Sequence, residues 1–427
     1  MLRTLFFLSA CLFLPLFSFA QQLVITNVNV IPVGGGPMTL ANQTVFIKDG
    51  KISEITPFQE EHMKLKARLI DGTGKYLIPG LADMHVHLPD DKSPLLLKKV
   101  FTLNLAAGVT TLRSMRGEQR HPGLRDSIRK KLILAPDLYI SNPLPSDSAV
   151  TAAELKAFVA KSKKEGWDFV KYLSGLSPAL FDSAVKYCGE QQLKLAGHVY
   201  NGDLQTALKA KQASVEHYQP ILKEFRKDST QFEKVIAQLK ENSVFVCPTL
   251  SFYYIFGFQF SPEQLKRRNG MSYLDKTVQE TWMKTYMDYY NSFDTPEKKT
   301  ELQKGIGRST KNLEDFGKLL KRMNDKKVQL LLSADDGEFN VPGFSLAEEM
   351  KLYKKAGLSN YEILKIATYN AACFFGAQKE WGSIGRGKKA NLVLLDKDPL
   401  KDIENITAVK GVILGGDYYS QQELLAK

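Results

Sequence analysis

The stretch from residue 79 to residue 381 alternates short apolar runs with helical patterns, and this alternation constrains the fold more than any other feature. The helical patterns carry charged residues at a spacing of three to four. The apolar runs are LADMHVH, VTTLRS, PDLYIS, DFVKYLS, LKLAGHV, ASVEH, SVFVCPTL and VQLLLSAD. Strands that alternate with helices build a parallel sheet, and eight such units close into a barrel. We therefore predict an α/β fold in which residues 79–381 form a (β/α)8 TIM barrel.

Both ends of the chain have a different sequence pattern. Short segments of alternating apolar and polar residues are separated by residues that favour turns. Residues 21–78 contain QLVITNVNVIPV, QTVFIKDGKISEI and ARLIDGTGKYLIP, and residues 382–427 contain ANLVLLDKDPL and AVKGVILGGDYYS. Alternating apolar residues with Asp-Gly turns indicate hairpins. We expect the two ends to pair into one small β-sandwich domain.

An insertion separates the seventh and eighth runs of the barrel. Residues 254–326 form a long, aromatic-rich and mostly helical excursion. Substrates bind at the C-terminal face of such barrels. The insertion should therefore lie above that face, where it could form a lid or a contact between copies of the chain in a homo-oligomer.

Residues 1–20 resemble an export signal. They begin with a basic residue, continue with an apolar run and end with small residues, which predicts a signal peptide cleaved after Ala20. A membrane anchor is disfavoured because Pro15 breaks the short apolar run. A lipoprotein signal ending at Cys11 is the weaker alternative. We expect an exported protein, periplasmic or secreted, without a stable membrane span.

Composition excludes several other classes. The chain has 427 residues, of which 44% are hydrophobic, which is enough for a large globular core. Its net charge of +12 is scattered among acidic residues rather than gathered in a stripe, so nucleic-acid binding is not expected. Without the leader, Cys188, Cys247 and Cys373 remain, and this odd, widely spaced set predicts buried thiols rather than disulfides.

Polar residues gather where the predicted strands end. The motif DMHVH places two imidazoles on one strand face, because residues i and i+2 point the same way. The residues of this set are His85, His87, Lys171, His198, His217 and Asp335. Singly, the lysine could be a surface group, the later histidines core residues, and the aspartate a helix cap. Together they would converge on one barrel mouth, which favours a metal centre.

The residues of these motifs resemble those of the metal-dependent amidohydrolase superfamily, in its prolidase-like and imidazolonepropionase-like branch. The resemblance rests on IPGLADMHVH, AGVTTLR, WDFVKYLSG, AGHVY, SVEH and the segment from GFSLAEEM to DPLKDI. Three features depart from the family pattern. Ser114 stands where relatives tend to have an acid, Asn391 replaces the usual Asp of the late GKKAD motif, and residues 254–326 match no part of the pattern. These departures concern the substrate rather than the metal ligands.

The resemblance implies a centre of two divalent metal ions, with zinc as the expected metal. Lys171 would carry a carbamate that bridges them. One ion would be held by His85, His87 and Asp335, and the other by His198 and His217. Asp335 would also act catalytically as the proton shuttle.

Three more residues, Tyr200, Arg113 and Arg116, are candidates for binding the substrate. Tyr200 would donate a hydrogen bond to the substrate in the way that a tyrosine does in similar dipeptidases, with packing under the loop as the alternative. Arg113 and Arg116 could bind a substrate carboxylate or lie on the surface.

The predicted function is hydrolysis of an amide bond in a small-molecule substrate, such as a dipeptide, an Xaa-Pro-like substrate or an N-acyl amino acid, by a metal-activated water. A lactonase, carbamate or phosphoester hydrolase on the same metals is an alternative, because the loops decide the substrate. A non-catalytic binding protein is a third, although the complete set of six residues argues against it.

Overall fold

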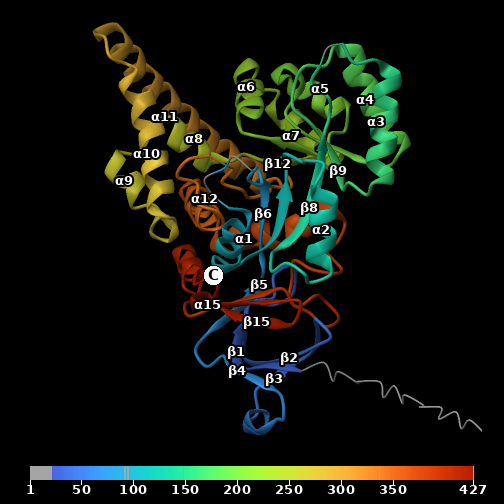
Figure 1. The fold of residues 1–427 in the computed structure, drawn as a ribbon, viewed down its shortest axis with the longest axis vertical. Coiled ribbons are helices and arrows are strands. Elements are labelled where there is room, and N and C mark those ends of the chain that lie inside the picture. The colour runs from blue at the N-terminus through green and yellow to red at the C-terminus, as the bar shows by residue number, and fades with distance from the viewer. Residues whose placement is uncertain (1–21, 91–92, 94–95, 148, 336, 427) are drawn as a thin grey trace, which may run out of the picture.

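The computed structural model describes residues 22–90, 93, 96–147, 149–335 and 337–426. The predicted leader, residues 1–20, lies outside them. Two sheets organise the described chain, one parallel and one mixed. Figure 1 shows the mixed sheet at the bottom and the parallel one above it.

The parallel sheet forms the predicted TIM barrel. Its strands follow the chain order, each paired with the next, and the strands are β6 (Leu81–Val86), β7 (Val109–Ser114), β8 (Asp137–Pro143), β9 (Phe169–Tyr172), β10 (Lys194–Gly197), β11 (Ser214–Glu216) and β12 (Phe245–Cys247). Most of their residues are buried, as expected for strands that helices cover on the outside.

The eighth predicted strand, VQLLL, closes the barrel in an irregular form. Leu330 makes an isolated parallel bridge to Val246 rather than a regular ladder. The amide of Leu331 donates to the carbonyl oxygen of Val246 at 2.9 Å, and the amide of Met84 donates to that of Leu332 at 3.1 Å. This run therefore joins β12 to β6, and its end lies beside the end of the first strand.

Helices cover the barrel strands. They are α1 (Leu97–Ala106), α2 (His121–Arg129), α3 (Ala152–Lys164), α4 (Pro178–Glu190), α5 (Leu204–Lys209), α6 (Gln219–Lys227), α7 (Phe232–Glu241), α12 (Phe344–Lys355), α13 (Asn360–Lys365) and α14 (Ala371–Phe375). Local sequence fixes where several begin. At α3, the Thr151 hydroxyl accepts from the amide of Glu154, whose carboxylate accepts from the amide of Thr151. Such a cap stabilises a helix by ~1 kcal/mol.

The two chain ends build one mixed sheet, which confirms that they form a common β domain. Its strands are β1 (Leu23–Val30), β2 (Leu40–Lys48), β3 (Lys51–Pro57), β4 (Arg68–Asp71), β5 (Tyr76–Pro79), β13 (Leu392–Leu395), β14 (Val409–Leu414) and β15 (Asp417–Ser420), followed by helix α15 (Gln421–Leu425). Antiparallel pairing of β13 with β5 joins the ends. Asn391 links this domain to β8, since its side chain donates to Asp137 at 2.8 Å and accepts from the amide of Gly415 at 2.8 Å.

The segment from the end of β12 to the closing run forms a helical layer beside the barrel. Its helices are α8 (Leu250–Phe256), α9 (Pro262–Lys266), α10 (Lys276–Asn291) and α11 (Pro296–Asp325). Figure 1 shows α10 and α11 as a hairpin that projects beyond the barrel at the upper left. Within the described part of the chain, no helix combines the length and the apolar character that crossing a membrane requires.

Candidate metal centre

The six polar residues singled out in the sequence stand at the carboxyl ends of the barrel strands. His85 lies in β6, with His87 one residue beyond that strand, and Lys171 lies in β9. His198 and His217 directly follow β10 and β11, and Asp335 follows the closing run. Because parallel strands bring these ends to one face, the fold gathers residues that are up to 250 positions apart, from His85 to Asp335.

His85, Lys171 and Asp335 meet at the centre of this face. The Lys171 Nζ atom lies 3.3 Å from Nε2 of His85, and Oδ1 of Asp335 lies 3.8 Å from the same nitrogen. Lys171 is only 1% exposed, so the surface reading of this lysine is wrong. One ligand atom each from His85, His217 and Asp335 lies within 4.8 Å of the others, which is close enough to share an ion.

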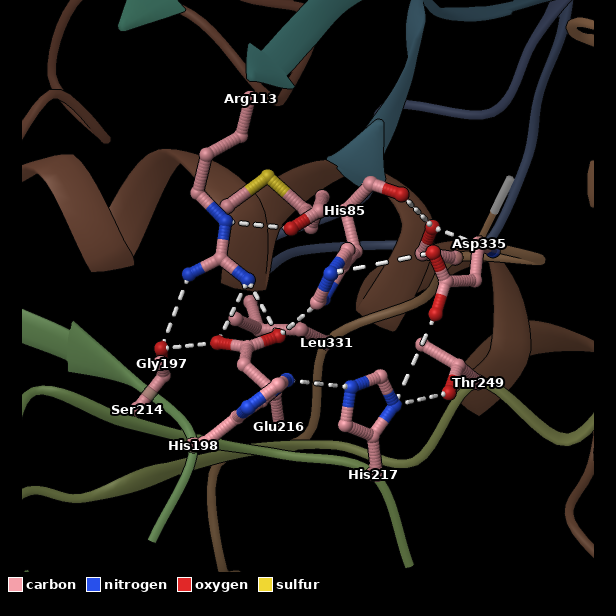
Figure 2. Close-up of polar contacts among 12 residues, drawn as sticks. His85, Arg113, Gly197, His198, Ser214, Glu216, His217, Thr249, Leu331 and Asp335 are labelled. Carbon is pink, nitrogen blue, oxygen red and sulfur yellow. Dashed lines mark hydrogen bonds and ion pairs between the residues drawn. The ribbon is translucent and has the colours of Figure 1, made fainter. Parts of the chain in front are cut away.

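His198 and His217 face each other across the mouth, as Figure 2 shows. Their Nε2 atoms are 3.2 Å apart. Nδ1 of His198 donates to the carbonyl oxygen of Leu173 at 3.0 Å, and Nδ1 of His217 lies 2.8 Å from Oγ1 of Thr249. Because a carbonyl oxygen only accepts, the Nδ1 proton of His198 points outward, and the Nε2 lone pair of His198 faces Nε2 of His217. That arrangement suits a shared cation better than an empty gap.

Burial keeps these imidazoles neutral. Desolvation, followed by the nearby charge of Lys171, lowers the pKa of His87 to about 3 and holds the pKa of His85 well below its ordinary value. Desolvation also lowers the pKa values of His198 and His217. A neutral imidazole is the form that binds a metal, so the donors fit a divalent ion across the neutral pH range.

A buried ion pair lies beneath His85. Oε2 of Glu216 accepts from Nδ1 of His85 at 2.8 Å, and both carboxylate oxygens of Glu216 lie 2.9 Å from Nη2 of Arg113. Arg113 also donates to Oγ of Ser214 at 2.9 Å and to the carbonyl oxygen of Met84 (Figure 2). Arg113 is fully buried, so neither the surface reading nor the carboxylate-binding reading of this residue holds.

Two of the six residues have an unusual backbone conformation. His217 has φ of 68° and Asp335 has φ of 62°, and Thr249, the partner of His217, has φ of 52°. Left-handed conformations are costly for residues other than glycine and persist at functional sites where the surroundings enforce them. Asp335 does not cap the next described helix, because α12 begins only at Phe344.

A cavity of about 330 Å³ opens beside the centre. The residues that line it include His87, Asp335, Arg116 and Trp282. Trp282 comes from α10, so the insertion contributes to the cavity wall. The volume suits a small molecule.

Tyr200 has a different environment. Its ring lies 5.0 Å from the ring of Phe181 and 5.9 Å from that of Tyr172, which agrees with the packing alternative. Tyr200 is also absent from the described residues that line the cavity. A hydrogen bond from its hydroxyl to the substrate stays a prediction.

Sequence reasoning did not assign roles to Glu216 and Thr249. Glu216 stood in the quoted motif SVEH, and an acid inside a short apolar strand was a signal that could have been used. Thr249 offers no such signal, because a threonine after an apolar strand is common. The three cysteines are free thiols in the structure, with Cys188 and Cys247 buried and Cys373 partly exposed.

Comparisons with known proteins show a family match and similar folds. Residues 76–418 match the model of the amidohydrolase family. A Xaa-Pro dipeptidase with bound methionine has a similar structure, with a TM-score of 0.69 and 18% identity over 93% of this chain and 100% of that one. A putative prolidase from Bifidobacterium longum has a TM-score of 0.68 and 20% identity over 94% of this chain and 95% of that one. The A. niger ochratoxinase has a TM-score of 0.67 and 19% identity over 94% of this chain and 96% of that one. A search of curated proteins gives no match.

Proposed function

Because the chain belongs to the amidohydrolase family, we propose that it is a metal-dependent hydrolase that cleaves an amide bond of a small substrate. One observation carries the proposal. Buried and half-buried neutral imidazoles meet a carboxylate and a buried lysine at the mouth of the barrel, beside a cavity of about 330 Å³. A dense cluster of ionisable groups in such a place marks a functional site.

The described residues would hold two divalent ions, with zinc as the preferred metal. His85, His87 and Asp335 would hold one ion, and His198 and His217 the other, with Lys171 between the two groups. Nitrogen and carboxylate donors of this kind suit zinc. When bound, such ions lower the pKa of a water molecule to ~7 from ~15.7 and polarise a carbonyl group.

Lys171 would carry a carbamate. Its neutral amine would add to carbon dioxide through a new N–C bond and release one proton, which turns a potential cation into an anion with two oxygen donors. The support is its place: Lys171 is 1% exposed and lies 3.3 Å from Nε2 of His85. An ammonium in that position would repel metal ions, whereas a carbamate compensates their charge.

Asp335 is the group that moves the proton. Its two carboxylate oxygens lie 3.8 Å from Nε2 of His85 and 3.6 Å from Nδ1 of His217. It also lines the cavity in which a substrate would sit. Asp335 would accept a proton from the attacking water as the new C–O bond forms. It would return that proton to the leaving nitrogen as the C–N bond breaks.

The size of the cavity supports a small substrate. Trp282 also lines the cavity. Arg116 would pair with a substrate carboxylate and is the cationic side chain among the described lining residues, which also include the acidic Asp83, Asp90, Glu118, Asp335 and Glu338. A dipeptide, including one of the Xaa-Pro kind, or an N-acyl amino acid combines a short amide with a terminal carboxylate. The similar structures of a Xaa-Pro dipeptidase and an ochratoxinase point the same way.

The test has two arms. Elemental analysis of the purified protein should give close to two transition-metal ions per chain. A screen of the metal-loaded protein against dipeptides, N-acyl amino acids and lactones should give turnover on the amides. Failure to bind zinc, manganese or cobalt would refute the metal centre, and turnover confined to lactones would refute the amide assignment.

A further inference from the structure

Arg268 is a buried arginine that the insertion contributes, and it contacts two loops of the barrel mouth. It follows α9 and is 7% exposed. Its Nε donates to the carbonyl oxygen of Phe339 at 2.9 Å. Its Nη2 donates to Oγ of Ser251 at 2.8 Å and to Oδ1 of Asn340 at 3.2 Å. The planar guanidinium therefore ties three groups together in one fixed geometry.

The first of these loops carries Asp335. Asn340, which accepts from Arg268, donates through Nδ2 to the carbonyl oxygen of Ala334 at 2.9 Å. Ala334 directly precedes Asp335, whose φ of 62° needs support from its surroundings. Arg268 therefore reaches the backbone beside Asp335 through one intervening side chain.

The second contact is with the segment from Thr249 to Ser251, which contains the partner of His217 and the first residues of α8. Ser251 donates through Oγ to Asn340 at 2.9 Å, and its amide donates to Oε2 of Glu349 at 2.6 Å. The amide of Leu250 donates to the other oxygen of Glu349 at 2.8 Å. These bonds fix the start of α8, directly after Thr249, whose hydroxyl contacts Nδ1 of His217. Arg268 thus touches the supports of both Asp335 and His217.

The residues next to Arg268 pack the insertion against the segment that follows Asp335. Nδ2 of Asn269 donates to the carbonyl oxygen of Phe344 at 3.2 Å. Gly270 has φ of 83°, and a Cβ atom there would lie 2.6 Å from Cβ of Phe344. The rings of Trp282 and Tyr286 lie 6.0 Å and 5.8 Å from that of Phe339. This close packing indicates that the insertion supports that segment and is not a freely moving lid.

We propose that Arg268 is a positioning residue through which the insertion holds Asp335 and the Thr249–His217 pair in register with each other. Its importance for the metal centre rests on the function proposed above. The contacts themselves do not depend on a metal, so the proposal can be tested separately.

The experiment compares R268A with R267A, because Arg267 is an exposed arginine one position earlier in the same chain. Hydrogen exchange is measured on the metal-free proteins over residues 249–252 and 337–345. In R268A, exchange of these amides should accelerate at least about tenfold, because the bonds that hold both loops are lost. R267A should match the wild type. Guanidinium at millimolar concentration should restore slow exchange in R268A, because it can occupy the vacated space.

A second readout uses Co²⁺ as the probe. The visible absorption spectrum of bound Co²⁺ should differ between R268A and the wild type and return when guanidinium is added. If R268A does not fold, R268K replaces it. A lysine keeps the charge but not the forked donors, and it should show the same changes to a smaller degree.

Equal exchange in R268A and R267A, or no response of R268A to guanidinium, would overturn the proposal. A wild-type protein that binds no Co²⁺ would instead refute the proposed function. The exchange measurements would still decide the role of Arg268 in that case.

Discussion

Glu216 accepts a hydrogen bond from Nδ1 of His85 at 2.8 Å and so directs Nε2 of that histidine toward Lys171 and Asp335. The same carboxylate neutralises the buried Arg113. One acidic side chain thus sets the tautomer of a proposed metal ligand and compensates a charge in the core of the barrel.

E216Q should therefore weaken zinc binding about 10- to 100-fold, because an outer partner of a ligand histidine is altered. It should also destabilise the protein by roughly 3–5 kcal/mol, because Arg113 stays buried without its counter-charge. Competition with a chelator measures the first effect, and chemical denaturation the second. The double variant R113M/E216Q separates the two, since it should recover stability but not zinc affinity. Wild-type affinity in E216Q would show that Glu216 does not orient His85.

K171A should lose most of its bound metal and about tenfold or more of its turnover, because the anionic bridge is gone. A short carboxylic acid should restore part of both, since it can supply two oxygens in the vacated space. Elemental analysis with and without the added acid provides the measurement. Full metal content and activity in K171A would rule out the carbamate.

D335N should keep much of its metal, because an amide oxygen can still coordinate, but it cannot accept the proton of the attacking water. Turnover of a dipeptide should fall about 10²- to 10⁴-fold. An activated ester with a good leaving group should suffer less, because its leaving group needs no proton. Parallel assays of metal content and both substrates test this. Equal losses on the two substrates would argue against Asp335 as the proton donor.

W282A should relax the selection for short substrates, because Trp282 is a large side chain that lines the cavity. The ratio of kcat/KM for a longer peptide to that for a dipeptide should rise about tenfold, as expected when one large aromatic contact is removed. Y289A is the matched control, since Tyr289 lies on the same helix and is 54% exposed. An unchanged ratio in W282A would mean that the insertion does not set substrate length.

Glu349 should make stability depend on pH in the metal-free protein. Burial raises the pKa of this carboxyl to about 8 from 4.5, although the amides of Leu250 and Ser251 oppose the rise. A raised pKa means that the folded state holds a proton which the unfolded state has released. The contribution of Glu349 is thus complete below pH 4.5 and is lost as the pH rises through about 8.

Relative to E349Q, the free energy of unfolding of the wild type should therefore decrease as the pH rises from 4.5 to about 8. The slope should approach, at most, about 1.4 kcal/mol per pH unit. Denaturant titrations of both proteins at several pH values measure it. A difference between the two proteins that stays constant with pH would contradict the assignment.

The sequence by itself determined the fold class and the positions of the six polar residues. Strand-like runs that alternate with helical patterns admit few arrangements, and a parallel barrel brings every strand end to one face. The spacing in DMHVH and the histidines after two later strands were therefore enough to place a cluster at the mouth. The pairing of the two chain ends followed in the same way from period-two alternation and turn signals.

Only the tertiary structure decided which groups support that cluster. Arg113, Glu216 and His85 come from three different strands, so no spacing along the chain relates them. No local pattern distinguishes the buried Arg268 from the exposed Arg267 beside it. Local patterns reflect the periodicity of single elements, whereas a buried charge is satisfied by partners that packing brings from distant segments.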